Sequence, residues 1–235
     1  MKLIKIPFSL QRDGAELAPS EIIKFLNTKS YEISEVKEKI YENLKNKDHF
    51  IAVGGDHSIT LPVLKAFSES HSKPGLVMLD AHPDCDRFLN LANQKDLLIE
   101  LVNNNIIKKE NIIVVGVRKV KQNEAEFLKN NAIRLFDMKT IFDIGIKEAC
   151  DLIMENARRC DNLYITIDMD VVDPAFAPGV SNSEPGGLSS VELLYLVGRL
   201  RLLKNLRAAD IVEVNPPKDI NSMTVKLAAH VVQSF

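Results

Sequence analysis

Short, continuously apolar runs alternate along the chain with longer segments in which apolar residues recur three and four positions apart. Runs that are apolar at every position are typical of strands buried on both faces, as in a parallel sheet covered by helices. The three- and four-residue spacing is typical of amphipathic helices. Strands are therefore predicted at residues 50–53, 75–79, 111–117, 162–167 and 209–214, and helices at residues 34–46, 59–70, 95–105, 147–159 and 191–203.

The alternation of strands and helices predicts an α/β fold, with three layers (α/β/α) around a mostly parallel central sheet. No internal repeat, low-complexity tract or linker rich in proline and glycine interrupts the pattern, so residues 1–235 are expected to form a single domain. In such folds ligands bind at the carboxyl ends of the strands. The functional residues are therefore to be sought where the predicted strands end.

Length, composition and charge narrow the class of protein. The 235 residues are 46% apolar and 26% charged, which is ordinary for a globular protein with a sizeable core. The chain has neither an apolar run of about 18 residues nor the pattern of a secretory signal at its start. Cys85, Cys150 and Cys160 lack CxxC spacing, which indicates free thiols and a cytoplasmic location. A net charge of -2 without a long basic block favours a small-molecule partner over nucleic acid or membrane.

Acidic residues and histidines directly follow three of the predicted strands. After residues 75–79 they stand two positions apart, so they can point to one side if the backbone stays extended until Pro83 stops the strand. The carboxyl ends of parallel strands meet at one edge of the sheet, and the three strand ends are therefore expected to converge. The convergent side chains are His57, Asp80, His82, Asp84, Asp168 and Asp170.

Two imidazoles and four carboxylates suit two hard or borderline divalent cations. Carboxylates favour oxygen-preferring metals and imidazoles admit first-row transition metals, so Mn²⁺ is the first choice on ligand type. Two such cations bring four positive charges to the four carboxylates and neutralise the cluster. A structural zinc site is disfavoured, because it usually contains thiolates in a closed tetrahedron. Each strand end alone would indicate a cap or a turn, and the combination of the three indicates metal.

Three motifs resemble the signatures of the ureohydrolases, the family of arginase, agmatinase and formimidoylglutamase. They are GGDHS at residues 54–58, DAHPD at 80–84 and the long, highly specific TIDMDVVDPAFAPGVSNSEPGGLS at 166–189. The resemblance continues in IPFSLQRDGAELAPSEI near the start and IVEVNPPKDINSMTVKLAA near the end, and so covers nearly the whole chain. It implies an arginase-like fold and a homo-oligomer, commonly a trimer or hexamer.

The resemblance also implies a dinuclear manganese centre. Its two ligand sets would share two bridging carboxylates: His57, Asp80, Asp84 and Asp168 for one ion, and His82, Asp80, Asp168 and Asp170 for the other. A water shared by the two cations becomes hydroxide near neutral pH and attacks the planar guanidinium carbon, while Asp84 accepts its hydrogen bond.

The resemblance to the ureohydrolases implies that two glutamates contact the substrate. Glu213, in VEVNP, matches the family position that holds the substrate guanidinium, which a carboxylate binds well in bidentate fashion. A structural alternative for Glu213 is a strand-end acid that caps a turn. Glu184, in SNSEPGG, resembles the acid in the agmatinase form of the third signature and is expected to face the pocket. The expected catalytic residues are thus Asp84 and Glu213.

The chain departs from the family pattern downstream of DAHPD. Family members carry a further histidine there, which contacts the substrate and can shuttle protons to the leaving amine. Here the next histidine after His82 is His230. Gln94 or Asn93 stands at that position, and Gln94 is expected to bind substrate, although an amide cannot transfer a proton in the same way.

We therefore expect a dinuclear-manganese hydrolase that splits a C–N bond of a small guanidino or amidine compound, agmatinase- or arginase-like and releasing urea. The missing histidine leaves open a catalytically weak or silent member that serves as a metal-dependent binding or regulatory protein. A deacetylase-like amide hydrolase on a related fold is disfavoured, because such enzymes usually bind a single zinc and the third signature is that of a ureohydrolase throughout.

Overall fold

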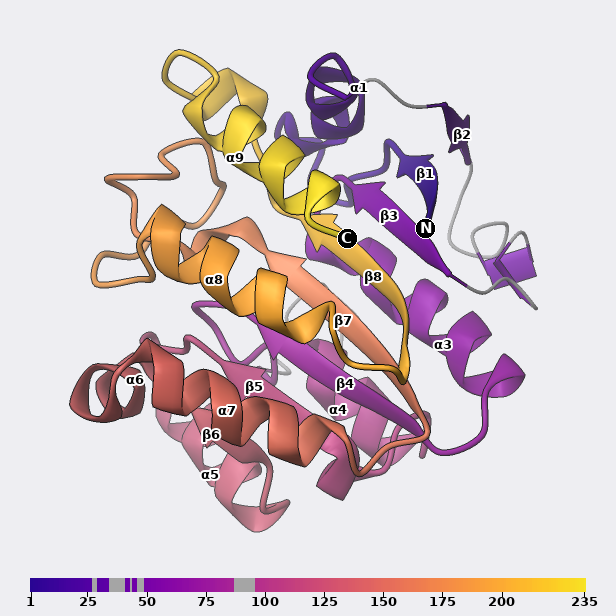
Figure 1. Cartoon of the computed structure of the whole chain (residues 1–235), viewed down its shortest axis with the longest axis vertical. Coiled ribbons are helices and arrows are strands. Elements are labelled where there is room, and N and C mark those ends of the chain that lie inside the picture. The colour runs from indigo at the N-terminus through magenta and orange to yellow at the C-terminus, as the bar shows by residue number, and fades with distance from the viewer. Residues whose placement is uncertain (27–28, 34–40, 43, 46–48, 87–95) are drawn as a thin grey trace.

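A central sheet, in which every paired strand is parallel to its neighbour, dominates the computed structural model (Figure 1). The structure describes residues 1–26, 29–33, 41–42, 44–45, 49–86 and 96–235. Within them the sheet has eight strands in the order β2-β1-β3-β8-β7-β4-β5-β6. The strands are Lys2–Ile6 (β1), Ser30–Glu32 (β2), Phe50–Gly54 (β3), Pro74–Leu79 (β4), Ile112–Val115 (β5), Arg134–Phe136 (β6), Asn162–Asp168 (β7) and Leu206–Val212 (β8).

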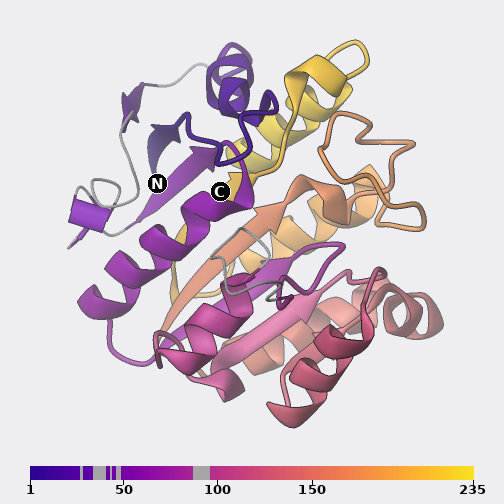
Figure 2. The ribbon, with the colours of Figure 1, turned by 180° about the vertical axis from the view of Figure 1, so that it is seen from behind.

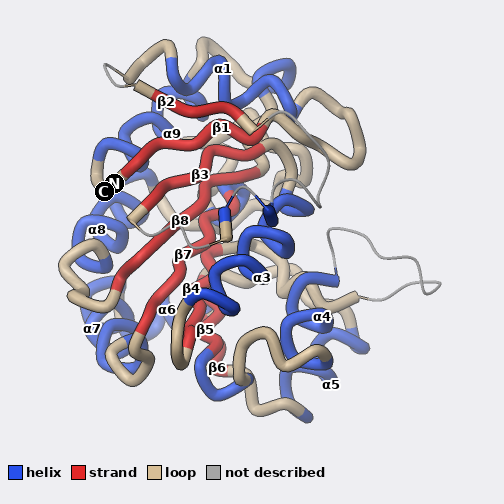
Figure 3. The backbone as a smooth tube through the Cα atoms, turned by 90° about the vertical axis from the view of Figure 1, so that its right-hand side faces the viewer, coloured by secondary structure: helices blue, strands red, loops and turns tan. Residues whose placement is uncertain are grey.

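Helices cover both faces of the sheet, and the predicted three-layer α/β/α fold is confirmed. Helices α1, α7, α8 and α9 pack on the face turned to the viewer in Figure 1, and α3, α4 and α5 pack on the opposite face, seen in Figure 2. Figure 3 shows the sheet between the two helical layers. The α-helices are Ala18–Ile23 (α1), Thr60–Ser70 (α3), Leu97–Asn103 (α4), Gln122–Asn130 (α5), Met138–Ile144 (α6), Ile146–Ala157 (α7), Ser190–Leu200 (α8) and Met223–Gln233 (α9).

The two faces of β4 explain its continuously apolar sequence. Val77 and Leu79 belong to the core on one side of the sheet, and Leu76 and Met78 belong to the core on the other. Successive residues of a strand point to opposite faces. Because helices cover both faces, every position of the strand after Pro74 is buried.

The five predicted strands correspond to β3, β4, β5, β7 and β8, although two of them end earlier than expected. The strand predicted at residues 111–117 ends at Val115, because Gly116 has a left-handed φ of 93°. The strand predicted at residues 209–214 ends at Val212, because Glu213 has a left-handed φ of 66°. Both bends lie at the carboxyl ends of the strands.

Four of the predicted helices, at residues 59–70, 95–105, 147–159 and 191–203, correspond to α3, α4, α7 and α8. The helix predicted at residues 34–46 lies largely outside the described residues. Among the described residues, no helix is both long enough and apolar enough to span a membrane.

The strand order brings the three motif-bearing strand ends together, as expected. Strands β3, β8, β7 and β4 are consecutive neighbours, so their carboxyl ends lie side by side. The chain leaves β3 through Gly55, where an added Cβ would lie 2.1 Å from the carbonyl oxygen of Phe8. Only glycine allows this close approach of two backbone segments.

Candidate metal centre

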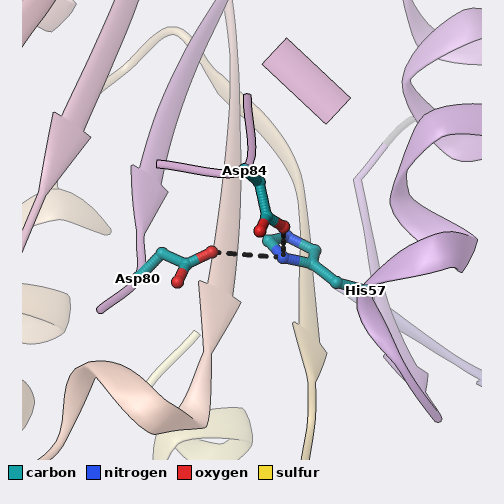
Figure 4. A group of neighbouring side chains, drawn as sticks. All are labelled: His57, Asp80 and Asp84. Carbon is teal, nitrogen blue, oxygen red and sulfur yellow. Dashed lines mark ion pairs between the residues drawn. The ribbon is translucent and has the colours of Figure 1, made fainter. Parts of the chain in front are cut away.

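His57 is held at the end of β3 by the turn that follows the strand. Asp56 caps this turn: its Oδ1 accepts a hydrogen bond from the Ser58 N–H at 3.1 Å, and its Oδ2 accepts one from the Leu10 N–H at 2.6 Å. Both oxygens of Asp56 are thus bound to backbone. The side chain of His57 points across the neighbouring strand ends toward Asp80 and Asp84 (Figure 4).

Residues 80–84 do not continue β4 in an extended form. The strand ends at Leu79 and the chain bends at Ala81 and His82, so the condition of an extended backbone up to Pro83 is not met. Asp84 then has a left-handed φ of 45°. The His82 N–H donates to Asp80 Oδ1 at 2.7 Å, which fits a bent segment. The side chain of Asp84 nevertheless reaches the centre.

His57, Asp80 and Asp84 form the first of two sets of side chains that could hold a cation, the His57 group (Figure 4). His57 Nδ1 lies 3.2 Å from Asp80 Oδ2 and 3.0 Å from Asp84 Oδ2. Asp168 Oδ2 approaches the same nitrogen at 3.5 Å. All of these side chains are buried, so one imidazole nitrogen meets three carboxylates away from solvent.

Asp80, His82 and Asp170 form the second set, the His82 group. His82 Nδ1 lies 2.9 Å from Asp170 Oδ2 and 3.6 Å from Asp80 Oδ1. Asp80 therefore presents one oxygen to each group. Asp168 connects the two in a different way, because its Oδ1 accepts a hydrogen bond from the Asp170 N–H at 2.8 Å while its Oδ2 faces the His57 group. All six residues predicted as metal ligands thus lie together.

A chain of hydrogen bonds behind His57 fixes which ring nitrogen faces the carboxylates. His57 Nε2 lies 3.2 Å from Thr166 Oγ1, and the Thr166 hydroxyl donates to Asp210. A carboxylate only accepts, so the single hydroxyl proton of Thr166 is used on Asp210 and its oxygen accepts from the His57 Nε2–H. Neutral His57 then turns the lone pair of Nδ1 toward the carboxylates, as a metal ligand does.

Asp210, in the interior of β8, is fully buried and supports this chain. It also accepts hydrogen bonds from the Tyr164 hydroxyl at 2.8 Å and the Thr60 hydroxyl at 2.9 Å. Sequence reasoning missed this residue. The signal that could have found it is a lone carboxylate inside a buried apolar strand, which requires partners.

Two buried atoms of the centre have no hydrogen-bond partner within the described part of the chain: His57 Nδ1 and Asp80 Oδ2. Unpaired buried polar atoms are costly and rare. An imidazole lone pair surrounded by carboxylate oxygens is, however, a suitable donor set for a first-row divalent cation. The residues present therefore fit a pair of divalent cations, one at each group.

Burial and the charges of neighbouring carboxylates raise the pKa values of Asp84 and Asp168. Burial, followed by the charge of Asp80, raises the pKa of Asp84 to about 7. Burial, followed by the charges of Asp170 and Asp80, raises the pKa of Asp168 well above its ordinary value. Burial lowers the pKa of His82, but the carboxylates of Asp170 and Asp80 outweigh it and raise the pKa to about 10. Added positive charge favours the ionised form of these acids, and two cations would provide it.

Glu213 lies directly after β8 and is almost fully buried. Its Oε1 accepts a hydrogen bond from the His57 N–H at 2.8 Å, and its own N–H donates to the Gly55 carbonyl at 2.8 Å. Burial raises the pKa of Glu213 to about 8, although the hydrogen bond from His57 opposes this. One oxygen thus caps a turn, as in the structural alternative, and the residue also lines the cavity at the metal groups.

Both groups open into a cavity of about 330 Å³. Glu184 lies in its wall, as expected, with Oε1 2.8 Å from Lys119 Nζ and 3.8 Å from His82 Nε2. Gln94 and Asn93 lie outside the described residues. The lining residues are His57, His82, Asp84, Lys119, Lys121, Glu124, Asp168, Asp170, Asn182, Ser183, Glu184 and Glu213.

Arg118 supports the segment that carries Asp170 and Glu184. Its guanidinium donates to the carbonyl oxygens of Asp170 and Glu184, each at 2.7 Å, and of Val171 at 3.2 Å. Sequence reasoning missed Arg118 and the two lysines after it, because the segment VRKVK has no recognisable ligand spacing.

Cys85 is buried next to Asp84, but its thiol is directed to α5, where Sγ lies 3.7 Å from the Glu124 carbonyl oxygen. Burial, followed by the charge of Glu124, raises the pKa of the Cys85 thiol. A protonated, packed thiol is a poor metal ligand.

Fold and site together define an α/β protein with a candidate dinuclear metal centre, and comparison with known proteins gives its family. Residues 23–235 match the family model described as Arginase family. An arginase from Staphylococcus aureus (strain COL) is 32% identical over 225 residues, which cover 87% of this chain and 74% of the relative. A formimidoylglutamase from Halalkalibacterium halodurans is 30% identical over 213 residues, covering 86% and 65%.

The crystal structure of formimidoylglutamase from Bacillus subtilis has the same fold, with a TM-score of 0.92 at 24% identity over 99% of this chain and 84% of that one. The chain therefore belongs to the arginase family, whose members hydrolyse C–N bonds. The resemblance and the arginase-like fold expected from the three motifs are confirmed.

Proposed function

We propose that this protein is a dinuclear-manganese hydrolase that cleaves a C–N bond of a small guanidino compound, which releases urea, or of a related linear amidine. The observation that carries the proposal is the position of Asp80, with Oδ2 3.2 Å from His57 Nδ1 and Oδ1 3.6 Å from His82 Nδ1. A carboxylate shared in this way suits two cations that lie close together. The names of the relatives, arginase and formimidoylglutamase, favour a substrate with a planar nitrogen-bearing carbon.

Two overlapping sets of side chains would hold the cations. When bound, two such ions lower the pKa of water so that a nucleophile is available near neutral pH, and they stabilise the negative charge that develops during the attack. The first set is His57, Asp80, Asp84 and Asp168, and the second is His82, Asp80, Asp168 and Asp170.

Asp84 acts on the attacking water, and Glu213 acts on the substrate. Asp84 accepts the hydrogen bond of the attacking water and orients it toward the substrate carbon. Glu213 binds the guanidinium: the His57 N–H holds its Oε1, which fixes the carboxylate and leaves Oε2 for a substrate N–H. Gln94 contacts the substrate from the position at which the family carries a histidine.

The test is an assay of the manganese-loaded protein. Metal content and urea release are measured together with arginine, agmatine, guanidinobutyrate and guanidinopropionate, and formamide release is measured with formimidoylglutamate. We expect two metal ions per chain and turnover of at least one compound. Two metal ions without turnover of any small guanidine or amidine would contradict the proposal.

A second candidate is a catalytically silent member that keeps the metals and acts as a binding or regulatory protein. The absence of histidine between His82 and His230 favours it, because the usual proton shuttle is missing. Gln94→His separates the two candidates. A large gain in kcat would identify a weakened enzyme that lacks its proton donor, whereas an inert variant with both metals bound would favour the silent member.

A further inference from the structure

Two lysines line the cavity of the metal centre, and the proposed chemistry uses neither of them. Lys119 and Lys121 follow β5, and their side chains are 61% and 57% exposed. The other ionisable side chains in the cavity wall are acids or metal-group histidines. Among the described residues of the cavity wall, the lysines are thus the largely exposed cationic groups that solvent and substrate can reach.

Both ammonium groups are held in place by an acid. Lys119 Nζ lies 2.8 Å from Glu184 Oε1, and Lys121 Nζ donates to Asp86, which also accepts from Asn123 Nδ2 at 2.7 Å. An ammonium has three N–H donors, so each lysine keeps donors for a ligand after making its ion pair. Positioned cations of this kind can bind a carboxylate with charge-assisted hydrogen bonds.

The acids of the cavity wall are poorly suited to a substrate ammonium. Glu184 is already paired with Lys119. Glu124 is 5% exposed, and its Oε2 accepts the Lys121 N–H at 2.8 Å. The remaining acids that line the cavity belong to the metal groups or are assigned to the guanidinium. A cationic substrate tail would therefore have to break an existing ion pair.

Two neutral side chains complete the wall. Asn182 and Ser183 line the cavity next to Glu184, and their side chains make no hydrogen bond to another described residue. An amide and a hydroxyl can donate to a carboxylate. The wall thus offers two cations and two neutral donors in one place.

We infer that the substrate carries a carboxylate, and not an ammonium, at the end opposite its guanidine or amidine, and that Lys119 and Lys121 bind it with help from Asn182 and Ser183. This inference rests on the proposed function. Glu184 Oε1 lies 3.8 Å from His82 Nε2 and 2.8 Å from Lys119 Nζ, which places the Lys119 ammonium near the His82 group, so the carbon chain between the two substrate groups is short. The substrate class is a short ω-guanidino or ω-amidino carboxylic acid.

Guanidinobutyrate and agmatine form a matched pair, because both have a guanidine on a four-carbon chain and they differ in the charge at the other end. We would measure their dissociation constants for the manganese-loaded protein by calorimetry, alongside kcat and KM for urea release. We expect guanidinobutyrate to bind at least about tenfold more tightly than agmatine, as one or two charge-assisted hydrogen bonds provide.

The variant that tests the residues is Lys119→Gln combined with Lys121→Gln. It should weaken guanidinobutyrate binding and raise its KM by about tenfold or more, change kcat much less, and leave agmatine binding unchanged. The control is Lys24→Gln, which removes a similarly exposed lysine paired with Glu21 at 2.6 Å on α1. It should alter neither compound's binding.

Tighter binding of agmatine, binding of neither compound, or an unchanged affinity for guanidinobutyrate in the double variant would overturn the inference. Turnover of agmatine or arginine in the same experiment would leave the proposed function intact. Conversely, lysine-dependent binding of guanidinobutyrate without hydrolysis of any compound would support the carboxylate site and contradict the proposed activity.

Discussion

The two metal groups share Asp80 but stand in different surroundings. The side chain of His57 is 1% exposed, and Thr166 and Asp210 hold its ring from behind. The side chain of His82 is 21% exposed, and its Nε2 faces Glu184 at 3.8 Å in the cavity wall. A hydrogen-bonded partner fixes a ligand histidine in orientation and raises its basicity. We therefore expect the His57 group to bind its cation more tightly, and the His82 group to lie nearer the substrate and exchange its cation more readily.

The largest effect should come from Asp80→Ala, because this change removes an oxygen from both groups at once. Loss of a hydrogen-bonded partner of a ligand typically costs about 10–100-fold in metal affinity, and loss of a shared ligand should cost more than roughly 100-fold. Metal content should fall below one ion per chain, with a similar loss in kcat/KM. Elemental analysis and a urea assay measure both.

Asp151→Ala is the matched control for this variant. Asp151 is an exposed acid on α7 whose Oδ1 lies 2.6 Å from Arg199 Nη2, away from the cavity. It should retain both ions. Two ions retained in the Asp80→Ala protein would contradict the shared position assigned to this carboxylate.

Replacing one histidine at a time separates the metal affinity of the His57 group from that of the His82 group. His82→Asn should leave about one ion per chain, held by the His57 group, whereas His57→Asn should weaken binding of both ions, because the tighter group is lost and the neighbouring acids repel one another. Manganese titration followed by calorimetry measures the two affinities. Equal residual metal binding in the two variants would show that the hydrogen bonds from His57 through Thr166 to Asp210 have no effect on metal affinity.

Asp210→Asn changes the hydrogen-bond chain behind His57 without replacing any of the six candidate ligands. An amide at this position can donate to Thr166, so the Thr166 oxygen is no longer committed to accept from His57 Nε2–H. We expect the affinity of the His57 group to fall by about 10–100-fold while the affinity of the His82 group changes little.

Tyr164→Phe provides the matched control for Asp210→Asn. It removes one hydroxyl donor to Asp210, at 2.8 Å, but leaves the link from Thr166 to His57 in place. It should cost about 1 kcal/mol of unfolding free energy and leave metal affinity near that of the unchanged protein. If both variants lose metal equally, Asp210 acts on general stability and does not position His57.

Glu184→Gln should have the smallest effect. Its partner Lys119 is largely exposed, and such ion pairs contribute about 0.2–1 kcal/mol. We expect a change in KM of no more than about fivefold, with both ions retained. A loss of the His82-group cation would instead show that Glu184 is part of the metal centre.

The difference between the two groups also separates what the sequence could predict from what it could not. The convergence of the six candidate ligands could be predicted because each follows a buried apolar run and because parallel strands end at one edge. The hydrogen bonds that hold His57 could not be predicted. Thr166 and Asp210 lie 44 residues apart and meet only when β7 pairs with β8. The bend after β4 was also missed, because nothing in DAHPD indicates that the chain bends at Ala81 and His82 or that Asp84 takes a left-handed φ.

The same reasoning holds for the fold. The central strands could be predicted because helices cover both of their faces. β1, β2 and β6 were missed. β1 (KLIKI) is interrupted by lysines at its first and fourth positions, and the other two strands have three residues each. Lys119 and Lys121 were missed for a related reason: nothing in VRKVK indicates that the segment after β5 lines the cavity.

The most direct test of the account is the crystal structure of the manganese-soaked protein, with anomalous diffraction measured at the manganese absorption edge. The account predicts two peaks, one in contact with His57 Nδ1 and Asp84 and one in contact with His82 Nδ1 and Asp170, both touching Asp80. When manganese is limiting, the peak at His57 should be the stronger. A single peak, or two peaks of which neither touches Asp80, would contradict it.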